Sequence, residues 1–289
     1  MEQKSTDLGS QEGEDKMLVI RQSMISDYEV CPYMCMKIWG KFGEPDPPFR
    51  ESDELTNKYA MCGTALHTVM DEWAKAVKGT AKYPLEHAQE RLVELITAIP
   101  DEVFTEDTTD GLTKDDWFEK MRDQLEWIWD IYTTAPPLFS ELNFHIENLI
   151  PGLPPIEGTM DRIDGNLRTQ DINLYDYKTG KQYTKKELSR NVQATLYSLA
   201  FEYMFGFRPK NFIFIFSKTK REKVIPITQE FIDRGLERIK GVWYKVLQED
   251  FTIPNKPNKF YCQNFCPVYD GCPKWSKASP EGWEGVDRL

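Results

Sequence analysis

The chain has 289 residues, of which 40% are hydrophobic and 29% are charged, and its formal net charge is −11. This composition is typical of a globular protein with one elaborated domain or two small ones, and the acidic charge argues against a protein that simply coats nucleic acid. No apolar run reaches the roughly 18 residues of a transmembrane helix, and the polar start has no hydrophobic signal segment. We therefore expect a cytoplasmic protein, without a membrane partner, whose six cysteines are reduced.

The first half of the sequence predicts helices. A polar stretch, residues 1–16, is expected to be disordered, and a single domain is expected over residues 17–275. Apolar residues at helical spacing then predict amphipathic helices. They are expected at residues 24–39, from Gly63 onward, and at residues 84–98 and 114–133, the last three within a helical insertion over residues 62–135.

The second half predicts a sheet. ELNFHIE, residues 141–147, alternates between apolar and polar side chains, as a half-buried strand does. Further strands are expected at residues 156–164, 171–178, 211–216 and, at a sheet edge because of Pro226, 223–227, with a crossover helix at residues 185–204. The catalytic sheet and its crossover helix thus span residues 139–227, followed by a long helix, residues 228–248, and by a C-terminal tail, residues 276–289. This order predicts an α/β core with an N-terminal helical insertion.

Acidic residues close two neighbouring strands of this predicted sheet. Asp161 closes GTMD, and Asp176 and Lys178 close INLYDYK. Side chains alternate along a strand, so Asp176 and Lys178 share one side while Tyr177 points away. Carboxylate oxygens are the ligands that Mg²⁺ or Mn²⁺ prefers, and a nearby ammonium can offset charge that grows in a transition state. Aspartates at strand ends are also common in turns and caps, but His67 one turn into a helix, and Gln193 and Tyr197 on one face of another, favour metal-assisted phosphodiester hydrolysis.

Four motifs in this order, GTALH, GTMDRID, DYKTGK and Q-x-x-x-Y, resemble the RecB-type branch of the PD-(D/E)XK nuclease superfamily, as does the opening MISDYEVCPYMC. The resemblance runs from about residue 24 to about residue 275 and implies a restriction-endonuclease-like core. It implies that the metal is bound by His67, Asp161, Asp176 and the backbone carbonyl of Tyr177. Lys178 is then catalytic, Gln193 and Tyr197 support the site and the DNA strand, Glu141 matches an acidic position on the first strand, and Asp164 is an alternative ligand to Asp161.

Three cysteines near the C-terminus, Cys262-x3-Cys266-x5-Cys272, have a spacing typical of a metal site, and Cys31 can supply a fourth ligand if the chain ends meet. Four thiolates suit zinc and an iron–sulfur cluster equally well. The resemblance favours the cluster, because iron–sulfur members of the RecB-type branch, such as the CRISPR-associated RecB-like exonucleases and the AddB nuclease domain, use one cysteine before the core and three after it. It implies a 4Fe–4S cluster that joins the termini, although the first gap in those relatives is two residues. Cys35 is a core residue or a substitute ligand, and Cys62 a packed thiol.

The resemblance predicts a metal-dependent DNA exonuclease that uses Mg²⁺ or Mn²⁺ and acts on single-stranded ends. No Walker motif occurs, so no helicase engine is expected. Alternative functions are a structure-dependent endonuclease, a nuclease subunit of a repair or recombination complex, a catalytically idle DNA-binding module, and a zinc-stabilised interaction domain. Association as a homo-oligomer, or with repair or recombination proteins, is left open. Basic residues follow the aspartate pair and are candidate phosphate contacts: Lys181, Lys185, Lys186 and Arg190, then Arg208, Lys210, Lys218, Lys220, Arg221 and Lys223.

Overall fold

A five-stranded mixed sheet forms the centre of the computed structural model, which describes residues 19–39, 58–105, 110–259, 261–262, 266–269 and 271–275. The strand order is β1-β2-β3-β4-β5; β3 and β4 are parallel, and the other neighbours are antiparallel. The strands are β1 (Phe139–Ile146), β2 (Ile156–Asn166), β3 (Asp171–Lys178), β4 (Asn211–Phe216) and β5 (Arg221–Pro226). The predicted α/β core with a mixed sheet is confirmed, and Pro226 lies on an edge strand.

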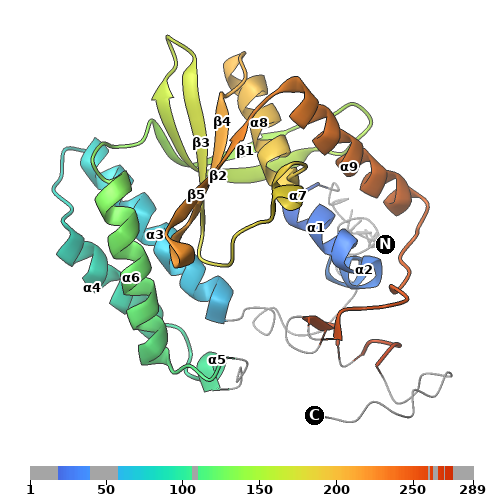
Figure 1. The fold of residues 1–289 in the computed structure, drawn as a ribbon, viewed down its shortest axis with the longest axis horizontal. Coiled ribbons are helices and arrows are strands. Elements are labelled where there is room, and N and C mark those ends of the chain that lie inside the picture. The colour runs from blue at the N-terminus through green and yellow to red at the C-terminus, as the bar shows by residue number, and fades with distance from the viewer. Residues whose placement is uncertain are drawn as a thin grey trace, which may run out of the picture.

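Helices cover both faces of the sheet (Figure 1). One face, called the α8 face, packs against α1 (Gln22–Val30), α8 (Val192–Phe205) and α9 (Gln229–Leu247). The other, called the α3 face, meets a helical bundle of α3 (Lys58–Lys78), α4 (Leu85–Thr97) and α6 (Lys114–Tyr132). Shorter elements are α2 (Pro32–Trp39), α5 (Glu102–Thr105), α7 (Lys185–Leu188) and the 3₁₀ turn η2 (Ser217–Thr219). Each face therefore has its own buried apolar cluster.

Two predicted helices are interrupted. The expected helix at residues 24–39 is wrong as a single element, because α1 ends at Val30 and Cys31 is extended, with φ −159° and ψ 108°. Pro32 explains the break, since a residue before proline avoids the helical region. The expected helix at residues 185–204 is likewise two helices, and Asn191 caps the second by accepting a hydrogen bond from the Ala194 N–H. Cys31 consequently stands at a corner between α1 and α2.

The two ends of the described chain lie together. Ile20 forms a parallel bridge with Ile156, and the Tyr28 hydroxyl donates to the Asp250 carbonyl. The predicted disordered tails, residues 1–16 and 276–289, lie outside the described residues. Within the described part of the chain, no helix is both long and apolar enough to span a bilayer.

The contact between α8 and α9 depends on the absence of a side chain at Gly235. A Cβ atom there would lie 2.0 Å from Thr195 Oγ1, whereas one at Gly241, in the same helix, would meet nothing within 4 Å. We expect Gly235→Ala to destabilise the protein by about 1–3 kcal/mol through overpacking. Gly241→Ala should stabilise it by about 0.5–1 kcal/mol, because alanine is the better helix former. Urea unfolding of both variants tests this, and two shifts of the same sign would contradict it.

Candidate active site

The antiparallel pairing between β2 and β3 ends at Arg162 and Tyr175. The next residue on each strand is an aspartate, and both are buried: Asp161 is 8% exposed and Asp176 is 2% exposed. The backbone N–H of Tyr177 donates to Asp161 Oδ2 at 2.8 Å, so a side chain takes the place of the interrupted strand pairing. The end of the β2–β3 ladder thus brings two carboxylates together inside the protein.

The alternation of β1 and β2 shifts by one residue at the same level. Met160 and Ile163 both pack in the cluster on the α8 face, although they are three positions apart. On β1, Phe139 and Leu142 do the same, and Glu141 between them has a φ of 46°, a left-handed conformation that is uncommon for a residue with a side chain. Irregularities of this kind change the direction of side chains beside functional sites. In this sheet, the redirected side chains are those of Glu141 and Asp161.

Asp176 and Lys178 lie on the same side of β3, as predicted, and form an ion pair with Lys178 Nζ 2.8 Å from Asp176 Oδ2. The side-chain amide of Gln193, in the first turn of α8, donates to the other oxygen of Asp176. Burial lowers the pKa of Lys178, but Asp176 and Asp161 more than offset that effect and raise it above its usual range. The lysine therefore remains a cation inside the site.

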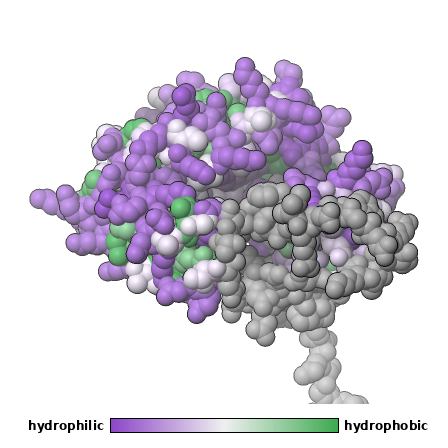
Figure 2. Space-filling view, turned by 60° about the horizontal axis from the view of Figure 1, so that its bottom comes forward, coloured by the Kyte–Doolittle hydropathy of each residue, from purple (hydrophilic) through white to green (hydrophobic). Residues whose placement is uncertain are grey.

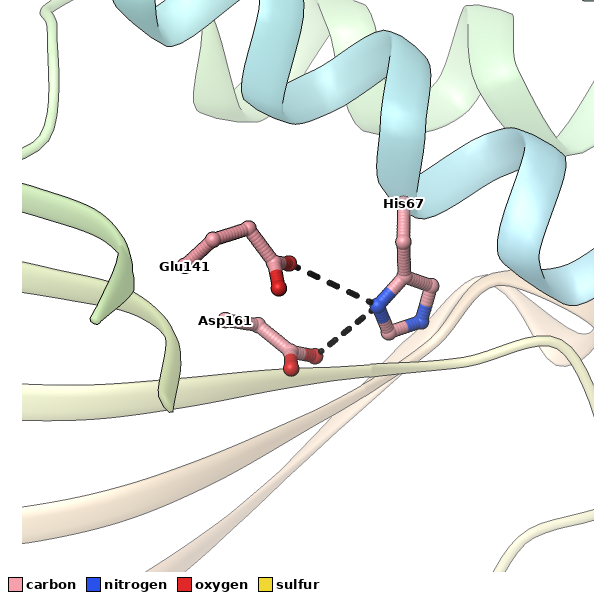
Figure 3. Close-up of side chains that lie close together, drawn as sticks. All are labelled: His67, Glu141 and Asp161. Atoms are coloured by element: carbon pink, nitrogen blue, oxygen red, sulfur yellow. Dashed lines mark ion pairs between the residues drawn. The ribbon is translucent and has the colours of Figure 1, made fainter. Parts of the chain in front are cut away.

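His67, Glu141 and Asp161 converge from α3, β1 and β2 (Figure 3). His67 Nδ1 lies 3.4 Å from Asp161 Oδ2 and 4.0 Å from Glu141 Oε1. One ligand atom from each residue lies within 4.8 Å of the others, a spacing that suits a metal ion. His67 Nε2 lies 3.0 Å from the Tyr177 carbonyl oxygen. With the proton on Nε2, that carbonyl orients the imidazole and leaves Nδ1 facing the carboxylates.

Burial, and after it repulsion between carboxylates, sets the electrostatics of this group. Burial, and then the charge of Asp176, raise the pKa of Asp161 to about 7, against the opposing effects of His67 and Lys178. Burial also raises the pKa of Glu141. Both pKa shifts mean that the ionised form of these carboxylates is destabilised unless a further positive charge lies nearby. A divalent cation among them would supply that charge.

Two glycines of the sequence motifs allow helices to approach the site. A Cβ atom at Gly158, in GTMD, would lie 2.9 Å from Tyr197 Cε1 and 2.8 Å from Phe144 Cζ. Tyr197 packs edge-on against Phe144 above this glycine, near Gln193 and Asp176. At Gly63, in GTALH, a Cβ atom would lie 3.2 Å from Thr179 Oγ1, so α3 passes close to the turn after β3.

The alternative ligand, Asp164, lies apart from the cluster. Arg162 Nε contacts both of its carboxylate oxygens, at 2.9 and 2.8 Å, and Nη1 of the same arginine donates to the Tyr132 carbonyl. The pair faces the helical bundle, where Arg162 stacks over Trp73. Asp164 is therefore engaged in a structural ion pair.

The structure adds supporting residues that sequence reasoning did not identify. Ser217 is fully buried, and its Oγ lies 2.6 Å from Gln124 Oε1 and 3.2 Å from the Lys178 carbonyl oxygen. These contacts join the bundle helix α6 to the backbone of the site lysine. Nothing in the linear sequence signals them, since Gln124 and Ser217 are 93 positions apart.

A cleft with a volume of about 630 Å³ opens beside the cluster. One wall is α3, with Gly63, Thr64 and His67 among its residues, and the other contains Glu141 and residues 177–180. Figure 2 shows a molecular face covered mainly by hydrophilic side chains. The first predicted basic group is exposed, and no described carboxylate pairs with it: Lys181, Lys185, Lys186 and Arg190. In the second group, three members pair with acidic residues: Arg208 with Glu202, Lys210 with Asp171 and Lys220 with Asp123.

A second pocket gathers cysteines from both ends of the chain. Its lining includes Trp275 and four cysteines, Cys31, Cys262, Cys266 and Cys272. No three of these sulfurs lie within 4.8 Å of one another among the described residues.

The other two cysteines have different environments. The Cys35 thiol points to the Met24 carbonyl oxygen at 3.5 Å, and Cys35 packs in the apolar cluster of the α8 face. Cys62 is buried in the helical bundle. Neither residue lines the cysteine pocket.

A comparison with known protein families identifies one match. The model of one family, the PD-(D/E)XK nuclease superfamily, matches residues 22–273, which include both the carboxylate cluster and the cysteine pocket except for Trp275. No curated protein matches the chain by sequence. Among solved structures, the chain is similar to a protein from Eubacterium rectale provisionally named an exonuclease, with 10% identity, 90% of this chain and 98% of that chain covered, and a TM-score of 0.46, a likeness that carries no information about activity. Because the family model spans most of the sequence, the chain belongs to the PD-(D/E)XK nuclease superfamily.

Proposed function

We propose that this protein is a metal-dependent DNA exonuclease of the RecB-type branch that hydrolyses single-stranded ends. The observation that carries the proposal is the convergence of His67, Glu141 and Asp161 next to the Asp176–Lys178 ion pair at the wall of a cleft. A protein that only bound DNA would have no need to bury two aspartates that repel each other. Membership of a nuclease superfamily supports the same reading.

The donor set suits a hard divalent cation, and imidazole tilts the choice from Mg²⁺ towards Mn²⁺. We propose that His67, Asp161, Asp176 and the Tyr177 carbonyl surround this cation. We add Glu141, because its carboxylate lies in one cluster with His67 and Asp161. When bound, such a cation polarises a phosphoryl oxygen and lowers the pKa of a water molecule.

The remaining residues act on charge and orientation. Lys178 is a partly buried cation that pairs with Asp176 at the cleft wall, where it can offset negative charge that develops on the attacked phosphate. Gln193 holds Asp176 by a hydrogen bond, and Tyr197 stands beside Gln193. These two therefore keep the carboxylate aimed at the site.

Dimensions and charge of the cleft support a single-stranded substrate. Its volume, about 630 Å³, is in the range of small-molecule sites and suits a few nucleotides of one strand. The α3 wall contributes small side chains, Ala60, Gly63 and Thr64, that leave room for a backbone. Lys181 and its exposed basic neighbours follow directly after Gly180 of the wall and can contact phosphates.

Substitutions within β2 and β3 separate ligand, catalytic and structural roles. Asp176→Ala removes a carboxylate from a hard-cation site, so both Mn²⁺ affinity and cleavage should collapse. Lys178→Ala keeps the ligands, so it should retain Mn²⁺ and DNA binding but lose turnover by roughly a hundredfold or more, as expected for one preorganised electrostatic group. Asp164→Ala is the control on the same strand as Asp161: it should lower stability, because Arg162 loses its partner, but the activity of the folded protein should remain close to wild type.

Calorimetric Mn²⁺ titration and a nuclease assay on end-labelled single-stranded DNA measure these effects. Wild-type turnover by Lys178→Ala would show that the lysine is only a structural charge. An inactive Asp164→Ala beside an active Asp161→Ala would reverse the assignment of the β2 ligand.

Two substitutions at Glu141 can separate the effect of its carboxylate charge from the effect of its left-handed backbone strain. Glu141→Gln removes the charge and keeps the strain, whereas Glu141→Gly removes both, because glycine adopts positive φ freely. Both variants should bind Mn²⁺ more weakly, and Glu141→Gly should be more stable than Glu141→Gln by about 1 kcal/mol. Unfolding measured with a chelator present tests the stability difference, and unchanged Mn²⁺ affinity in both variants would remove Glu141 from the site.

The proposal includes a 4Fe–4S cluster held by Cys31, Cys262, Cys266 and Cys272. Four thiol donors, from both ends of the chain, line one pocket. The indole N–H of Trp275, on the same pocket, faces the Cys262 thiol and lowers its pKa against the larger raising effect of burial. A cluster there would join the two ends of the chain.

Anaerobically purified protein should be brown and contain about four irons per chain. Cys266→Ala should lose the iron, while Cys35→Ala, a control on the neighbouring helix, and Cys62→Ala should retain it. Elemental analysis and visible absorption provide the measurement. One equivalent of zinc in place of iron would refute the cluster, and iron loss in Cys35→Ala would mean that a different cysteine is the fourth ligand.

A further inference from the structure

Arg238, on α9, connects two segments that are distant in sequence. Its guanidinium binds both carboxylate oxygens of Glu29 on α1, with Nε 2.6 Å from Oε1. Its remaining nitrogen, Nη1, donates to the Arg190 carbonyl at 2.7 Å. The arginine side chain is 22% exposed and that of Glu29 is 30% exposed, so the contact lies at the protein surface with part of each side chain covered.

Both segments lead directly to a site. Glu29 lies in the last turn of α1, two residues before Cys31 of the cysteine pocket. Arg190 precedes Asn191, which caps α8, and Gln193 in the first turn of α8 donates to Asp176. A continuous series of contacts thus runs from the corner at Cys31 to a carboxylate of the candidate active site.

A neighbouring arginine strengthens the same attachment. Arg234, one turn earlier on α9, donates from Nε to the Ser189 carbonyl at 3.1 Å. Two successive carbonyls before α8 are therefore held by α9, at the point where the predicted crossover helix is interrupted. A loop held by several hydrogen bonds keeps the helix that follows it in place.

The contacts of Arg238 are not needed to hold α9 on the core, so their effect falls on the orientation of the segments that they join. That helix is already anchored by buried apolar side chains, among them Ile232, Ile239 and Trp243. A guanidinium is also the only side-chain cation that can bind a carboxylate through two nitrogens and a carbonyl through a third, because its donors form a rigid planar fork. Lysine cannot reproduce this pattern.

We propose that Arg238 is a positioning residue, which ties the cysteine corner to the start of α8 and so fixes Gln193 against Asp176. The inference rests on the proposed nuclease function of that carboxylate. It makes catalysis depend on the integrity of α1 and of Cys31 at its end, although neither touches the reacting groups. The exposed basic residues before α8, which include Lys185 and Lys186, are held by the same loop.

The test compares Arg238→Lys and Arg238→Gln with Lys240→Gln, which removes an exposed cation from the same helix. Both Arg238 variants should lower kcat on single-stranded DNA about tenfold or more, because small displacements of catalytic groups are costly. Mn²⁺ affinity and global unfolding should change little. Hydrogen exchange of residues 189–194 should accelerate in these two variants and stay at the wild-type rate in Lys240→Gln.

A charge swap, Glu29→Arg with Arg238→Glu, separates positioning from a simple ion pair. It restores opposite charges, but a glutamate cannot donate to the Arg190 carbonyl, so kcat should stay low and exchange should stay fast. Full recovery in the swap would overturn the positioning role, as would wild-type exchange of residues 189–194 in Arg238→Gln. Inactive wild-type protein with accelerated exchange in Arg238→Gln would refute the proposed function and leave the structural tie standing.

Discussion

Two aspartates buried side by side, where β2 and β3 stop pairing, are the constraint around which this structure is arranged. A buried carboxylate is tolerated only when it is hydrogen-bonded or paired with a cation. Asp161 receives the Tyr177 N–H and faces His67, and Asp176 receives Lys178 and Gln193. Since these partners come from β3, α3 and α8, the two carboxylates dictate which elements must meet at this point of the sheet.

Meeting there requires close approach, and the chain provides it at a few positions. Gly158 gives space to Tyr197, and Gly63 lets α3 pass beside Thr179. At Glu141, by contrast, the approach requires backbone strain, because a left-handed conformation directs a third carboxylate towards the two aspartates. Strain and repulsion thus accumulate at one place, which is typical of a site whose native ligand is positively charged.

Short-range patterns predicted much of this arrangement. The period of two in a strand placed Asp176 and Lys178 on one side, and the order of motifs placed His67 on a helix near them. The sequence left Asp164 open as an alternative to Asp161, because the one-residue shift of the strand at Asp161 comes from tertiary contacts that override simple alternation. The break at Cys31 was available in the sequence, since Pro32 follows it. Ser217 and Gln124 were not, because their contact joins elements that only the fold brings together.

The cysteine corner and the acidic site have a common support in α9. Protein contacts alone already fix the corner: Arg21 pairs with Glu157, Tyr28 with Asp250, and Glu29 with Arg238. The pocket lined by Cys31 and Cys272 is therefore formed by packing and ion pairs before any metal is considered. A cluster bound there would close a loop of more than two hundred residues. A cross-link across a long loop lowers the entropy of the unfolded chain more than one across a short loop. Because Arg238 extends from that corner to the start of α8, whatever tightens the corner also restrains the helix that holds Asp176.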